Sequence, residues 1–176
     1  MLGVASTIVV EPPSRVVTAV EARAARVFSD DDEAAYIENL LEVAQSLIDG
    51  PDGTLNRCIG EQVLQITLPD YVDVRGDCLP YPPFVEIVSN VLSDDGCTRI
   101  VKWKAGQEVA KVPKRIKYAI IMMAGKLRDA VPDEGGAIKR ETVDGIGSTE
   151  YSLPNGAADA MTSAAAWLLA PYKVYA

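Results

Sequence analysis

The chain has 176 residues, 48% of them hydrophobic, and its 17 basic and 25 acidic side chains give a formal net charge of −8. This length suits a single domain, and the hydrophobic share is enough to build a buried core. The sequence contains no histidine, so the commonest general base and the commonest zinc ligand are missing. We therefore expect no enzyme, no metal site and no cofactor.

Membrane and secretion signals are also missing from the pattern. No apolar run approaches the roughly 18 residues that a membrane helix needs. The opening stretch, MLGVASTIVV, lacks the basic start and the small-residue cleavage site of a secretory signal. We therefore expect a soluble, cytosolic protein with no membrane contact, in which residues 1–16 form an extended N-terminal segment of a single domain that spans residues 1–176.

The charge is distributed unevenly along the chain. Residues 29–56 carry eight acids and no base, whereas residues 99–128 carry nine bases and one acid. Two explanations stay open at this point. The two regions are either separate solvated faces of one monomer, or the acidic face of one subunit meets the basic face of the next in a head-to-tail oligomer.

Two helices are predicted in the first third of the chain. Thr18 followed by Glu21 has the spacing of a capping box, which starts a short helix. A longer helix is predicted within SDDDEAAYIENLLEVAQSLID, with Ser29 as its cap and acids in the first turn, and it stops at Gly50. The run Asp30–Glu33 resembles a metal cluster only superficially, since EF-hand spacing is absent and acids at a helix start usually compensate the dipole.

The middle of the chain, residues 62–105, changes to a β pattern. Alternation in EQVLQITLP predicts a strand, and two further β-rich runs cover residues 84–92 and 98–103. The sequence Ser-Asp-Asp-Gly between those runs has the composition of a hairpin turn. We therefore expect a β insertion built around a hairpin.

The remainder of the chain is predicted to be helical again. A third helix follows Pro113 and ends near Pro132, with an apolar stripe on one side and basic residues on the other. The polar stretch KRETVDGIGSTEYSLP predicts an extended arm. A last short helix ends at Pro171, and Trp167 and Leu168 are expected to pack on the core. The apolar C-terminal tail is taken as residues 168–176.

In this order the segments resemble a known family. The chain resembles the head-tail connector (adaptor) proteins of long-tailed phages and gene transfer agents in TAVEARAARVFSDDDEAAYIENLLEVAQSLID, EQVLQITLPDY, LPYPPFVEIVSNVLSDDG, VPKRIKYAIIMMAGKLRD and the closing LLAPY. The resemblance runs from Val17 to Tyr172, and the shared order is more specific than any single segment. The stretch after the hairpin, KWKAGQEVAKVP, is shorter than in many members of the family.

The resemblance implies a fold class and a function. The fold is expected to be mainly α, a small helical bundle with an inserted β-hairpin and an extended C-terminal arm and tail. The protein is expected to be a structural component of the virion neck, assembled in the bacterial cytoplasm. There it would form a ring beneath the portal, a dodecamer where the ring matches the portal. The ring would extend the DNA channel and dock a stopper or tail-completion protein. DNA would pass through without specific binding.

The resemblance and the charge pattern together suggest three sets of site residues. The tail is expected to contact the portal through Leu169, Pro171, Tyr172, Val174 and Tyr175. Subunits are expected to contact one another through Lys114, Arg115, Lys117, Glu38 and Glu42. The channel is expected to be lined by Asp30, Asp31, Asp32 and Glu33, because carboxylates repel the phosphates of a sliding duplex.

Three alternatives are weighed against the adaptor. Another neck component, a stopper or a tail terminator, belongs to the same class, but such proteins tend to be rich in β-structure. A small metal-dependent hydrolase would use Asp30, Asp31, Asp32 and Glu33. A DNA-binding module would use the bases of Lys111–Lys117 together with Arg128, although few aromatic residues lie among them and the chain is acidic overall.

Overall fold

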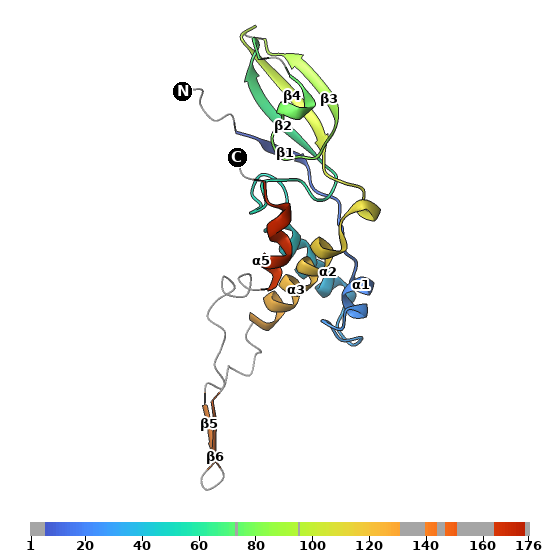
Figure 1. Cartoon of the computed structure of the whole chain (residues 1–176), viewed down its shortest axis with the longest axis vertical. Coiled ribbons are helices and arrows are strands. Elements are labelled where there is room, and N and C mark those ends of the chain that lie inside the picture. The colour runs from blue at the N-terminus through green and yellow to red at the C-terminus, as the bar shows by residue number, and fades with distance from the viewer. Residues whose placement is uncertain are drawn as a thin grey trace.

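The computed structural model describes residues 6–72, 74–94, 96–130, 140–143, 147–150 and 164–174. A β-sheet lies at one end of the molecule and a group of helices lies next to it (Figure 1). A small hairpin, formed by β5 (Arg140–Val143) and β6 (Gly147–Glu150), lies beyond the helices. This hairpin falls in the stretch that was expected to form an extended arm.

The expectation of a mainly α fold is wrong, because the sheet is larger than an inserted hairpin. Four antiparallel strands are arranged in the order β1-β2-β4-β3: β1 (Ile8–Glu11), β2 (Gln62–Pro69), β3 (Phe84–Leu92) and β4 (Thr98–Ala105). The N-terminal segment supplies β1, which pairs with β2, and β2 pairs with β4 over its full length. The protein is therefore an α/β protein, in which the four-stranded sheet and the helices are both major parts of the fold.

The helices follow their local signals closely. They are α1 (Ala19–Ala24), α2 (Ala34–Ser46), α3 (Lys114–Ala130) and α5 (Ala164–Leu169), the last continued by the short 3₁₀ turn η3 (Ala170–Tyr172). The capping box of α1 is confirmed, since the Thr18 hydroxyl accepts from the Glu21 amide and the Glu21 carboxylate accepts from the Thr18 amide. The expected cap at Ser29 is wrong, because Glu33 occupies the N-cap position of α2.

The helices pack around one hydrophobic core. Its largest fully buried side chains include Ile37 and Ile48 from the α2 region and Ile116 and Ile120 from α3. The apolar positions of α2 and α3 recur every three to four residues, so each helix buries one face against the other. This core includes Leu169 of α5, which ties the end of the chain to the middle of the fold.

The sheet has a second, separate core on one face. Leu64 and Ile66 of β2 and Val101 and Trp103 of β4 are buried there. The chain between β2 and β3, including the 3₁₀ turn η1 (Gly76–Cys78) and the buried Leu79, covers this face. Because the core lies under the two central strands, both edge strands remain exposed to solvent.

A buried carboxylate joins the two parts of the protein. Asp49, just after α2, accepts hydrogen bonds from the amides of Ile59 (2.7 Å) and Gly60 (3.1 Å). It also accepts from the side chains of Gln45 (2.9 Å) and Gln62 (2.8 Å). Burial raises the pKa of the Asp49 carboxyl, and the four hydrogen bonds offset this only in part. Asp49 thereby fixes the loop that leads from the helices into β2.

Candidate interaction surfaces

The tail lies against its own subunit. The amide of Val174 donates to the Leu55 carbonyl (2.9 Å), and the Val174 carbonyl accepts from the Asn56 side chain (3.1 Å). The Tyr172 carbonyl accepts from the Arg57 guanidinium (3.3 Å), and the Tyr172 ring packs partly against the helical core. Leu169 is also buried in the helical core. Leu169, Tyr172 and Val174, which were expected to contact the portal, therefore have contacts within their own subunit.

Of the two α5 residues expected in the core, Leu168 is confirmed, because it packs partly buried against the helical core, and Trp167 is wrong. Trp167, expected in the core, is 72% exposed, whereas Leu169 is 5% exposed. Ala165, Leu169 and Tyr172 recur at helical spacing on the face toward the core, and Trp167 lies on the opposite face. Pro171 is exposed, and Tyr175 lies outside the described residues. The exposed face of the tail segment is therefore centred on Trp167.

An open hollow of about 600 Å³ lies beside the end of the tail. Its walls are mostly apolar and come from the loop between α2 and β2, the β2–β3 connection, the start of β3 and the tail itself: Asn56, Gly76, Leu79, Pro80, Tyr81, Pro82, Phe84 and Val174. Among the described residues that line it, none carries a carboxylate, a lysine or an arginine side chain. Its described lining suits an apolar group.

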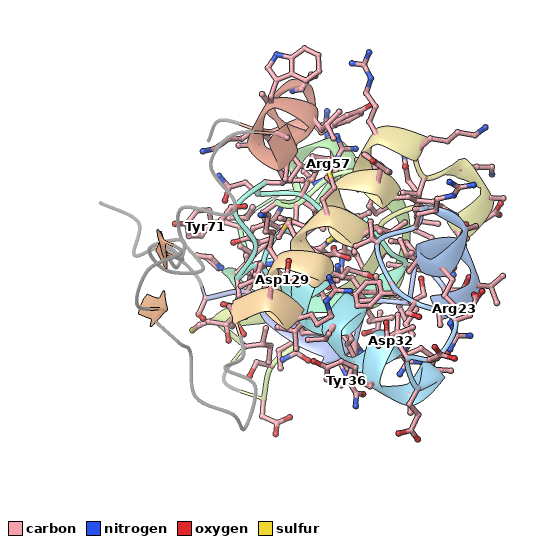
Figure 2. The ribbon with its side chains drawn as sticks, turned by 90° about the horizontal axis from the view of Figure 1, so that it is seen from below. Arg23, Asp32, Tyr36, Arg57, Tyr71 and Asp129 are labelled. Carbon is pink, nitrogen blue, oxygen red and sulfur yellow. The ribbon has the colours of Figure 1, made fainter. Side chains whose placement is uncertain are left out.

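The acidic run lies in the turn between α1 and α2, at one end of the helices. Asp30, Asp31 and Glu33 are exposed, and Asp32 is half-buried. The Asp32 carboxylate accepts from the Ser29 amide (2.7 Å), and its carbonyl accepts from the Arg23 guanidinium, which lies beside it (Figure 2). Asp32 therefore shapes the turn, while the other three carboxylates point to solvent.

The acids expected at a subunit contact are already paired within the subunit. Arg15 donates to Glu38 (2.6 Å) and to Glu42 (3.1 Å), so one guanidinium bridges two turns of α2. All three side chains are at least 40% exposed, and such pairs contribute little to stability.

One of the expected basic contact residues is also paired. Lys117 of α3 donates to Glu21 of α1 (3.0 Å). Burial alone would raise the pKa of Glu21, but the hydrogen bonds from the Thr18 amide and from Lys117 outweigh it and lower the pKa. Lys114 and Arg115 are exposed and have no ion pair with any described residue. They are accessible bases in the first turn of α3.

Acidic and cysteine side chains do not assemble into a metal site in the described part of the chain. No group of three acidic or cysteine side chains there could hold a metal ion. Cys58 is buried, and burial together with the nearby Asp49 carboxylate raises the pKa of its thiol. Cys78 and Cys97 are exposed. No described helix has the length and apolar character to cross a bilayer.

The two edges of the sheet are exposed surfaces that were not among the predicted sites. Every residue of β1 is exposed, and β3 exposes apolar side chains along its length, among them Val88 and Val91. A signal was present in the sequence. In FVEIVSNVL the apolar residues do not alternate with polar ones, which indicates a strand with apolar groups on both faces.

Comparison with known proteins gives no relative. No protein-family model, no curated protein and no solved structure matches the chain.

Proposed function

We propose that the protein is a head-tail adaptor, a structural subunit that forms a ring beneath a portal, extends the DNA channel and docks a stopper or tail-completion protein. The observation that carries the proposal is the ordered series of segments from Val17 to Tyr172 that resembles this family. In support, strands β2, β3 and β4 stand between α2 and α3 in the chain, which is the position of the family's β insertion.

The portal contact is assigned to the exposed face of the tail segment. Trp167 and Pro171 are exposed there, and a large exposed aromatic side chain is typical of an interface anchor. Leu169, Tyr172 and Val174 act behind this face by holding the segment on the subunit. Tyr175 follows directly and belongs to the same proposed contact.

The channel wall is assigned to the acidic turn. Asp30, Asp31 and Glu33 expose carboxylates with no ion pair to another described residue. A row of such carboxylates repeated around a ring would repel phosphates and let a duplex slide without tight binding.

The basic surface of α3 is assigned to a subunit contact. Lys114 and Arg115 are the expected contact residues that remain accessible, whereas Lys117, Glu38 and Glu42 have partners within the subunit. Charged rims of this kind set orientation and association rate more than affinity.

Imaging of the neck of assembled particles tests the proposal. We expect a ring of this chain between portal and tail, and particles without the chain should hold DNA-filled heads that lack tails. A neck without such a ring contradicts the proposal. Trp167→Ala should reduce recruitment of the protein to portal-bearing heads, while the exposed Val20→Ala should leave recruitment unchanged.

A further inference from the structure

The two edges of the sheet are unusually apolar for strands that face solvent. Ile8 of β1 is 50% exposed and Val91 of β3 is 59% exposed, and their neighbours Val9, Val10 and Leu92 are exposed as well. Each edge also presents backbone amides and carbonyls that pair with no strand among the described residues. Such edges are templates for pairing with another chain.

Natural edge strands usually carry features that prevent pairing, and β3 has these in only one half. Its bulges fall between Phe84 and Glu86 and between Ile87 and Ser89. From Ser89 to Leu92 the register with β4 is regular, and this stretch contains no proline and no charged residue. The regular half is four residues long, the same length as β1.

The strand order allows the two edges to meet between copies of the chain. All pairings in the sheet are antiparallel, and β1 and β3 form its opposite edges (Figure 1). With an even number of strands, β1 and β3 run in opposite directions. A second copy in the same orientation therefore adds its β1 to β3 as another antiparallel pair.

The charges near the two edges are complementary in one register. Strand β1 has a bulge between Val9 and Glu11, which places Ile8 and Glu11 on the same face of the sheet. If β1 keeps this bulge in the new pair, Ile8 of one copy opposite Val91 of the next brings Glu11 opposite Ser89, on the same face. Lys102 of β4 is the cross-strand partner of Ser89, and Glu11 is on the outer face of β1, opposite Val63. Neither Glu11 nor Lys102 has an ion pair with a described residue. The small Ser89 leaves room for the lysine to reach the incoming carboxylate.

We propose that β1 of one subunit adds to the free edge of β3 of the next along Ser89–Leu92, which joins neighbouring sheets head to tail. Such a heterologous contact closes into a ring when the rotation between copies permits it. The inference rests on the proposed function for its setting, because it names a contact of the proposed ring, but the pairing itself is a property of the purified chain.

Edge-blocking variants of the full-length chain test this pairing. Ile8→Lys blocks β1, Val91→Lys blocks β3, and Val20→Lys places the same charge on α1 as a matched control. Mass measurement over a concentration series should show assembly of the wild type and of the control. Each edge variant alone should stay monomeric, and an equimolar mixture of the two should form a heterodimer through the one intact pair of edges. Circular dichroism should show each variant folded.

A charge exchange provides a second, independent readout. Glu11→Lys and Lys102→Glu should each weaken association by about tenfold, and the double variant should recover most of the loss. A wild type that stays monomeric at its highest soluble concentration overturns the inference. So does assembly of Ile8→Lys alone, because it would mean that β3 pairs with β3 or that another surface is used. A ring in particles that is indifferent to both edge variants overturns this inference and leaves the adaptor proposal standing.

Discussion

The amide of Val174 donates a hydrogen bond to the carbonyl oxygen of Leu55 at 2.9 Å, so the end of the chain is attached to the loop that follows α2. This contact changes the meaning of the apolar tail. Its apolar residues were expected to contact the portal, but Leu169, Tyr172 and Val174 contact their own subunit. The buried face of this segment therefore stabilises the subunit, and the exposed face is the one proposed to dock.

A pair of variants separates these two tasks. Leu169→Ala removes a buried side chain and should lower the free energy of unfolding by about 2 to 4 kcal/mol. Trp167→Ala removes a side chain that is mostly in water and should change it by less than about 1 kcal/mol. Chemical denaturation measures both. Equal losses in the two variants would contradict the assignment of Trp167 to the outer face.

The Asp49 network should be the most sensitive polar site. Asp49→Ala leaves four donors without their acceptor in a buried place, so we expect a loss of about 2 to 4 kcal/mol in the free energy of unfolding. Asp52→Ala, an exposed acid three residues further on, is the matched control and should cost less than about 0.5 kcal/mol.

The same site predicts a pH dependence with a definite sign. Burial raises the pKa of Asp49 above its ordinary value of 3.8, so the folded state binds this proton more tightly than the unfolded state. Stability from this group is then greatest below pH 3.8 and falls as the pH rises through the folded pKa. The stability difference between wild type and Asp49→Ala should narrow as the pH rises from 3.8. A difference that widens would show that the hydrogen bonds outweigh burial.

Glu21 should behave in the opposite way. Its pKa is lowered from the ordinary value of 4.5, because hydrogen bonds from the Thr18 amide and Lys117 outweigh burial. Its contribution is therefore present above pH 4.5 and is lost as the pH falls through the folded pKa. Lys117→Met removes the cation that pairs with Glu21, and Lys126→Met, at an exposed lysine of the same helix, is the matched control. The cost of Lys117→Met should shrink below pH 4.5, and a cost that is the same at every pH would contradict this linkage.

The elements that the sequence predicts well are those set by neighbouring residues. The capping box of α1 and the bounds of α3 and β3 follow from spacings within a few residues of each other. Strand β1 could not be found in this way, because it pairs with β2 and Gln65, the partner of Ile8, is more than fifty positions away. The four residues of β1 also show no alternation of apolar and polar side chains. The fold class was therefore predicted wrongly, because strand β1 and the pairing of β2 with β4 were not predicted.

The sites show the same division between local and distant effects. The orientation of Trp167 was available from helical spacing, since Ala165, Leu169 and Tyr172 define the buried face without it. The pairing of Glu38 and Glu42 with Arg15 was not available, because it depends on how the N-terminal segment crosses α2. Charge segregation along a sequence therefore overstated the charge that is available for contacts between subunits.

The approach of two backbone segments at Gly106 provides the last prediction. Gly106 has a φ of +105°, and a Cβ atom there would lie 2.0 Å from the carbonyl oxygen of Gly60. Gly96 also has a positive φ, +65°, but a Cβ atom there would meet nothing within 4 Å. Gly96→Ala should therefore show only the backbone cost of about 1 to 2 kcal/mol. Gly106→Ala should cost clearly more and loosen the junction between the sheet and the helices. Thermal unfolding and hydrogen exchange at Gln107 measure both effects. Equal costs at the two glycines would show that the backbone segments at Gly106 and Gly60 can move apart without loss of stability.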